Sequence, residues 1–89
     1  MAEATATIRS EVGLHARPAT LFVTAVTETG LPVTIAKDGD APVDATSLLQ
    51  VMGLGARHGE KVTLTAEGTD ADAVLARLVE LLESDLDAH

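Results

Sequence analysis

Alternating apolar and polar positions predict four β-strands. The clearest case places Val62, Leu64 and Ala66 on one side of a segment and threonines on the other, as in a half-buried strand. Pro42 predicts an edge position for the short strand that contains it, because proline cannot donate a hydrogen bond within a central ladder. The predicted strands are residues 5–9, 33–36, 41–43 and 61–67, with a turn signal at Lys37-Asp38-Gly39-Asp40 between the second and third.

Apolar residues that recur every three or four positions predict three helices. The first spans about 16–27 and stops before Gly30, the second is short and follows Ser47, and the third follows Thr69. Thr69 with Asp72 three residues later resembles a capping box. The side chains expected to face the core are Leu21, Phe22, Ala25 and Val26 of the first helix and Val74, Leu75, Leu78, Leu81 and Leu82 of the third.

The order β-α-β-β-α-β-α predicts an α+β fold, a two-layer open-faced sandwich. We expect a four-stranded, mostly antiparallel sheet with three helices on one face and a solvated opposite face. The 89 residues are expected to form one domain, residues 1–89. Such a domain has no room for a deep substrate cavity, which argues against a metabolic enzyme with its own pocket.

Composition excludes several classes of function. With 6 basic and 14 acidic residues the net charge is −8, which disfavours binding to nucleic acid or to an anionic membrane. There is no cysteine, no signal peptide is visible, and no apolar run is long enough for insertion into a membrane. His15, His58 and the acidic residues lack metal-ligand spacing. We therefore expect a cytoplasmic protein with neither metal nor cofactor.

The most unusual chemistry lies in Val12-Gly13-Leu14-His15-Ala16-Arg17-Pro18-Ala19-Thr20. Proline is favoured in the first turn of a helix, so His15 is expected at a helix N-terminus, beside unpaired backbone N–H groups. Such a terminus binds anions, and the planar guanidinium of Arg17 adds a fork of donors for phosphate. A nucleophilic imidazole beside an oxyanion cradle predicts phosphoryl chemistry.

Two blocks resemble the HPr family, the histidine-containing phosphocarrier proteins of the bacterial sugar phosphotransferase system. The blocks are Gly13-Leu14-His15-Ala16-Arg17-Pro18-Ala19 and Ser47-Leu48-Leu49-Gln50-Val51-Met52-Gly53-Leu54-Gly55. The resemblance implies that His15 accepts a phosphoryl group on Nδ1 from phosphorylated Enzyme I and passes it to EIIA domains of sugar permeases. Ala16 and Arg17 would hold the phosphate. The protein would then be a stoichiometric carrier and not an enzyme.

Ser47 matches the family position that an HPr kinase/phosphorylase modifies in many bacteria. The chain departs from that regulated type at Thr46, often lysine, at Gln50, often glycine, and at Gly53, commonly serine. Ser47 also stands where a helix cap is expected, and both roles can hold together.

The resemblance also implies a docking surface, with Ala16 and Thr20 from the first helix and Leu48, Leu49 and Met52 from the second. Methionine suits a surface that serves more than one partner. Thr20 is equally compatible with a purely solvated position, and we expect at least one of the other three to be buried. A carrier that exchanges between partners is expected to be monomeric.

Three alternatives remain. One is an HPr-like carrier for a nitrogen-regulatory phosphotransfer chain or for a dihydroxyacetone kinase. Another is a regulatory binding module that acts through Ser47, against which the intact His15 and Arg17 argue. The third is a hydrolase with His15 as base, which lacks a second catalytic group and a pocket.

Overall fold

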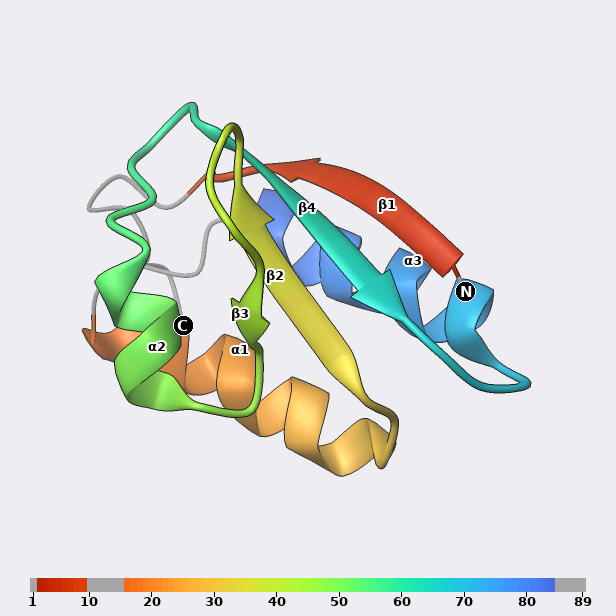
Figure 1. The fold of residues 1–89 in the computed structure, drawn as a ribbon. Helices are drawn as coiled ribbons and strands as arrows, with labels where there is room; N and C mark the ends of the chain where they lie inside the picture. The colour runs from red at the N-terminus through yellow and green to blue at the C-terminus, as the bar shows by residue number, and fades with distance from the viewer. Residues whose placement is uncertain (1, 10–15, 85–89) are drawn as a thin grey trace.

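The computed structural model describes residues 2–9 and 16–84, and within them the elements follow the predicted order (Figure 1). They are β1 (Ala2–Thr7), α1 (Ala16–Thr29), β2 (Val33–Lys37), β3 (Val43–Asp44), α2 (Leu48–Gly53), β4 (Lys61–Ala66) and α3 (Ala71–Glu83). These strands form one antiparallel sheet in the order β1-β4-β2-β3. The predicted α+β open-faced sandwich is therefore confirmed.

The two faces of the sheet differ in polarity, as the alternation predicts. Leu64 of β4 and Ile35 of β2 are register partners, and both are fully buried. On the opposite face Thr34 and Thr65 are also register partners, and a hydrogen bond joins their half-exposed hydroxyls. One face therefore supplies the floor of the core, and the other is open to solvent.

Helices α1 and α3 run across the buried face of the sheet (Figure 1). Phe22 and Val26 of α1, with Leu75 and Leu82 of α3, are at most 2% exposed. The short helix α2 contacts both α1 and β3, so it lies at the edge of the sandwich. None of the helices in residues 2–9 and 16–84 has the length and apolar character of a membrane span.

The first strand begins earlier than predicted, at Ala2, and ends at Thr7. Its alanines pair with positions on β4, as in Ala4 opposite Leu64, but alanine contrasts too weakly with its neighbours to mark a strand. Ile8 lies beyond the strand and still bonds to the turn before β4, with Ile8 N to Glu60 O at 2.9 Å and Gly59 N to Ile8 O at 2.8 Å. This turn therefore fixes where the chain leaves the sheet.

Helix α1 ends at Thr29, two residues later than predicted, and Gly30 follows with φ of +71°. Thr27 and Thr29 direct their hydroxyls back to the carbonyls of Val23 and Val26, at 2.9 and 2.7 Å. These hydrogen bonds satisfy acceptors near the helix end, and Gly30 provides the left-handed conformation that a helix stop often requires.

The edge strand is shorter than the pattern predicts. β3 contains only Val43 and Asp44, which pair with Ile35 and Thr34 of β2, and Pro42 lies just before it. The edge position is confirmed because β3 is the last strand in the sheet order. Proline lacks an N–H to donate to the ladder, so pairing begins only after it.

The capping box predicted for α3 is wrong. The helix is preceded by Asp70 as its N-cap, whose side chain makes no capping hydrogen bond. Ala71 N donates to Gly68 O at 3.3 Å, so a turn that begins at Gly68 directly precedes the helix. Gly68 has φ of +135°. Helix α3 therefore starts too late for Thr69 and Asp72 to take the N-cap and third helical positions.

Candidate functional site

The first turn of α1 is buried on one side and exposed to solvent on the other. Pro18 and Ala19 are buried, whereas Arg17 is exposed. This turn carries no acidic residue to offset the positive end of the helix dipole. A cation at this end does not stabilise the helix, so the position of Arg17 favours a role toward an external anion.

His15 directly precedes α1 in the sequence and lies outside the described residues, as does the side chain of Ala16. Their roles as phosphoryl acceptor and phosphate contact thus stay predictions. The structure does establish the framework next to them, a 14-residue helix with Arg17 exposed in its first turn.

Helix α2 begins as the sequence predicts. Ser47 is its N-cap, and the Ser47 Oγ accepts a hydrogen bond from Gln50 N at 3.3 Å. Gly55, with φ of +68°, follows the helix end. Ser47 is half-buried, and the cap is therefore one role that this residue fulfils in the fold.

The expectation that Leu48, Leu49 or Met52 is buried is wrong. They are exposed by 38%, 83% and 36%, and Val51 is the buried member of the described α2 side chains. A helix of six residues touches the core along a narrow line, so one position on it is buried and its neighbours remain outside. The predicted docking residues of α2 are thus all accessible.

Leu21 of α1 is exposed against expectation. It is 36% exposed although its spacing predicts a place on the core face of α1, and Thr20 beside it is also exposed. In the described part of the chain, the large hydrophobic side chains that stay exposed are Leu21, Leu48, Leu49 and Met52. They come from two helices in contact with each other. We call these four residues, with Thr20, the α1–α2 surface.

Asp44, the last residue of β3, accepts two hydrogen bonds from Thr46 just before α2. The Thr46 hydroxyl and then the Thr46 backbone N–H donate to the Asp44 carboxylate, at 2.7 and 2.9 Å, and they lower the pKa of Asp44 below its usual value. Asp44 is exposed, so its charge faces solvent near the start of α2. Within residues 2–9 and 16–84, no three His, Cys, Asp or Glu side chains form a cluster that could hold a metal ion.

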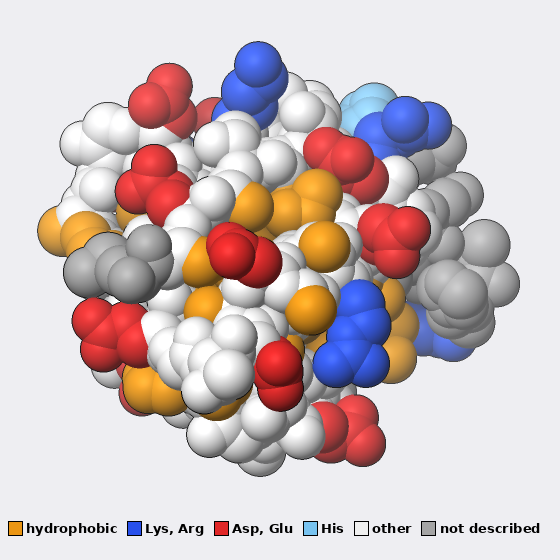
Figure 2. Space-filling model, turned by 90° about the vertical axis from the view of Figure 1, so that its right-hand side faces the viewer, with side chains coloured by type: hydrophobic (Ala, Val, Ile, Leu, Met, Phe, Trp, Pro, Cys, Tyr) orange, Lys and Arg blue, Asp and Glu red, His pale blue; other side chains and the backbone are white. Residues whose placement is uncertain are grey.

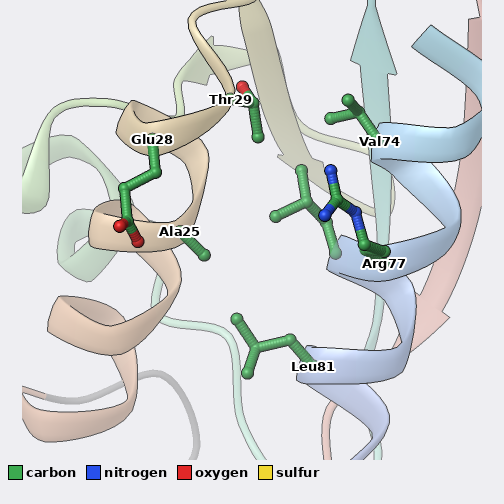
Figure 3. A pocket seen from close by; sticks show the side chains of 7 residues that line it. Ala25, Glu28, Thr29, Val74, Arg77 and Leu81 are labelled. Carbon is green, nitrogen blue, oxygen red and sulfur yellow. The ribbon is translucent and has the colours of Figure 1, made fainter. Parts of the chain in front are cut away.

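A separate groove lies between α1 and α3 (Figure 3). It has a volume of about 410 Å³, and the Arg77 side chain points into it while the Glu28 carboxylate points away. In the space-filling view of Figure 2, hydrophobic side chains gather near the middle of the face, with acidic ones set around them. The groove is lined by Ala25, Glu28, Thr29, Val74, Arg77, Leu78 and Leu81. The residues predicted for phosphoryl transfer and docking do not belong to this lining.

Comparisons with known proteins agree on one family. The family model described as "PTS HPr component phosphorylation site" matches residues 2–84. The chain is 48% identical to the phosphocarrier protein HPr of Streptomyces coelicolor, over 98% of this chain and 94% of that protein. It is 45% identical to the phosphocarrier protein HPr of Haloferax volcanii, over 92% and 93% of the two chains. The crystal structure of HPr-C-His from Thermoanaerobacter tengcongensis superimposes with a TM-score of 0.88 at 39% identity, covering 98% of this chain and 97% of the other.

Proposed function

Because the chain belongs to the HPr family, the phosphocarrier proteins of the phosphotransferase system, we propose that His15 accepts a phosphoryl group from phosphorylated Enzyme I and donates it to EIIA domains of sugar permeases. The observation that carries the proposal is Arg17, an exposed guanidinium in the first turn of a helix that has no acidic residue there. We place this stoichiometric carrier in the cytoplasm, as one monomeric domain, residues 1–89.

The chemistry requires a neutral imidazole. The lone pair of its Nδ1 forms the bond to phosphorus while the bond from phosphorus to the donor breaks, and the donor leaves with that electron pair. In the second transfer a nucleophile of the acceptor forms the bond to phosphorus while the Nδ1–phosphorus bond breaks, and its electron pair returns to Nδ1. Arg17 and the backbone N–H groups at the start of α1 would stabilise the negative oxygens during both transfers.

Docking would use the α1–α2 surface, together with Ala16. Its exposed apolar side chains lie on helices that are in contact, and α1 begins at the residue after His15. A partner that covers this surface would exclude water from the reacting groups. The donor would bring its phosphoryl group to Nδ1 of His15, and the acceptor would bring its nucleophile to the phosphorus atom. Charge added at Ser47 by an HPr kinase/phosphorylase would then alter docking, because Ser47 is the N-cap of α2 and directly precedes Leu48.

The test is intact mass after incubation with phosphoenolpyruvate and Enzyme I. We expect one acid-labile phosphoryl adduct on the wild type and on the His58→Ala control, and none on His15→Ala. His58 is an exposed residue of a turn, which makes it a matched histidine control. Addition of an EIIA domain should remove the adduct. An unmodified wild type, with an Enzyme I that phosphorylates another HPr, would overturn the proposal.

A further inference from the structure

Helix α2 is too short to orient itself. It has six residues, and of its described side chains only Val51 is buried. Isolated helices shorter than about 12 residues are marginal in water, so their direction depends on outside contacts. The contacts at the N-terminal end of α2 therefore matter for every side chain that it presents.

Those contacts form a closed set of hydrogen bonds between β3 and α2. The Gln50 Oε1 accepts from Asp44 N at 3.0 Å, and Gln50 N donates to the Ser47 Oγ at 3.3 Å. Ser47 N in turn donates to Asp44 O at 3.1 Å. We call residues 44–50 the β3–α2 corner. Gln50 is the residue whose side chain closes it, from the third position of the helix to the last residue of the strand.

We propose that Gln50 is a positioning residue for partner docking, because its side chain holds the first turn of α2 against the end of β3. Leu48 and Leu49 precede Gln50 and Met52 follows it, so a rotation of this helix would move all three together. This inference rests on the proposed docking role of the α1–α2 surface. A glycine at this position could not make the connection.

The effect on the free protein is tested by amide hydrogen exchange of Gln50→Met and Gln50→Glu. Methionine keeps the length and helix preference of the side chain but offers no carboxamide oxygen. Glutamate keeps an acceptor oxygen, and high ionic strength screens its added charge. We expect the Asp44 and Val51 amides of Gln50→Met to exchange about fivefold faster, the factor for loss of one ordinary hydrogen bond. Gln50→Glu should exchange like the wild type at high salt.

The effect on docking is tested by the kinetics of phosphoryl transfer from Enzyme I. For Gln50→Met we expect the KM for the carrier to rise about fivefold, from the same hydrogen bond, while kcat at saturating carrier is unchanged. Gln50→Glu should recover the wild-type KM at high salt.

The two measurements separate the alternatives. A raised KM without faster exchange would mean that Gln50 contacts the partner directly, and it would overturn the positioning role. Faster exchange with an unchanged KM, or no change in either quantity, would overturn it as well. A wild type that accepts no phosphoryl group overturns the proposed function instead, while the exchange experiment still tests whether Gln50 holds the β3–α2 corner.

Discussion

Gly68 and Leu31 lie so close together that a side chain at position 68 would displace the Leu31 side chain. A Cβ at Gly68 would stand 2.8 Å from the Leu31 Cδ2, and Gly68 has φ of +135°, which L-residues rarely adopt. Gly68 lies in the connection from β4 to α3. Leu31 lies in the connection from α1 to β2 and packs against the core. This pair therefore joins two connections at the same end of the sheet.

We predict that Gly68→Ala lowers the free energy of unfolding by about 1–3 kcal/mol, mostly from backbone strain. Urea unfolding monitored by circular dichroism measures this difference. Gly53→Ala is the matched control, because it has an ordinary helical position with no atom within 4 Å of the added Cβ. It should be neutral or slightly stabilising. Equal stabilities for the two variants would contradict the assigned strain.

Replacing Arg17 should separate activity from stability. Arg17→Ala removes an exposed cation from the positive end of α1, so the unfolding free energy should change by less than about 0.5 kcal/mol. Loss of a charge-assisted hydrogen bond to the phosphoryl oxygens should slow transfer from Enzyme I by about 10- to 100-fold. Phosphoryl-transfer assays that are quenched at a series of times measure this rate. Arg77→Ala, on α3, should retain the wild-type rate, and an equal loss in both variants would rule out a specific role for Arg17.

The α1–α2 surface should tolerate truncation where the core does not. Leu49 is 83% exposed, so Leu49→Ala should leave the thermal midpoint nearly unchanged and raise the KM of Enzyme I for the carrier. Val51 is fully buried two residues later, so Val51→Ala should cost about 2 kcal/mol of unfolding free energy. Calorimetry and transfer kinetics on both proteins check this contrast. A wild-type KM for Leu49→Ala would remove Leu49 from the docking surface.

Substitutions of Ser47 distinguish the helix cap from a regulatory site. Ser47→Ala removes the acceptor for Gln50 N and should lower the unfolding free energy by about 1 kcal/mol. Ser47→Asp keeps a capping oxygen and should restore the stability, because a negative charge is favourable at a helix N-terminus. If added charge regulates docking, Ser47→Asp will nevertheless transfer phosphoryl groups more slowly than the wild type. Full activity of the stable aspartate variant would argue for the cap alone.

The carboxylate of Asp44 makes a pH-dependent contribution to stability. Its folded-state pKa lies below the usual value of 3.8, first because the Thr46 hydroxyl and then because the Thr46 N–H donates to it. The stabilisation is therefore complete above the unfolded-state pKa and is lost as the pH falls through the folded-state pKa. Thr46→Val should raise the pKa of Asp44 part of the way toward 3.8, since the N–H remains. Carboxyl-carbon NMR titration measures the shift, with Thr24→Val as an exposed control.

Local patterns in the sequence determined the order of elements and identified the proposed phosphoryl-transfer motif. Strand periodicity in Val62-Thr63-Leu64 and the residue types around His15 and Arg17 need only near neighbours to be recognised. The predicted boundary of β1 was wrong because its alanines give only a weak local signal. The predicted start of α3 was wrong because a turn at Gly68 precedes the helix in place of the capping pattern at Thr69.

Tertiary structure alone decided which apolar side chains remain outside the core. Leu21 has the spacing of a core residue and yet is exposed, because whether an edge position is covered depends on the element packed beside it. The hydrogen bond from Asp44 N to Gln50 and the close approach of Gly68 to Leu31 likewise arise only when the chain folds back on itself. Local spacing thus identifies where the proposed phosphoryl-transfer motif lies in the chain. The packing of α2 against α1 and β3 determines the surface that we expect its partners to meet.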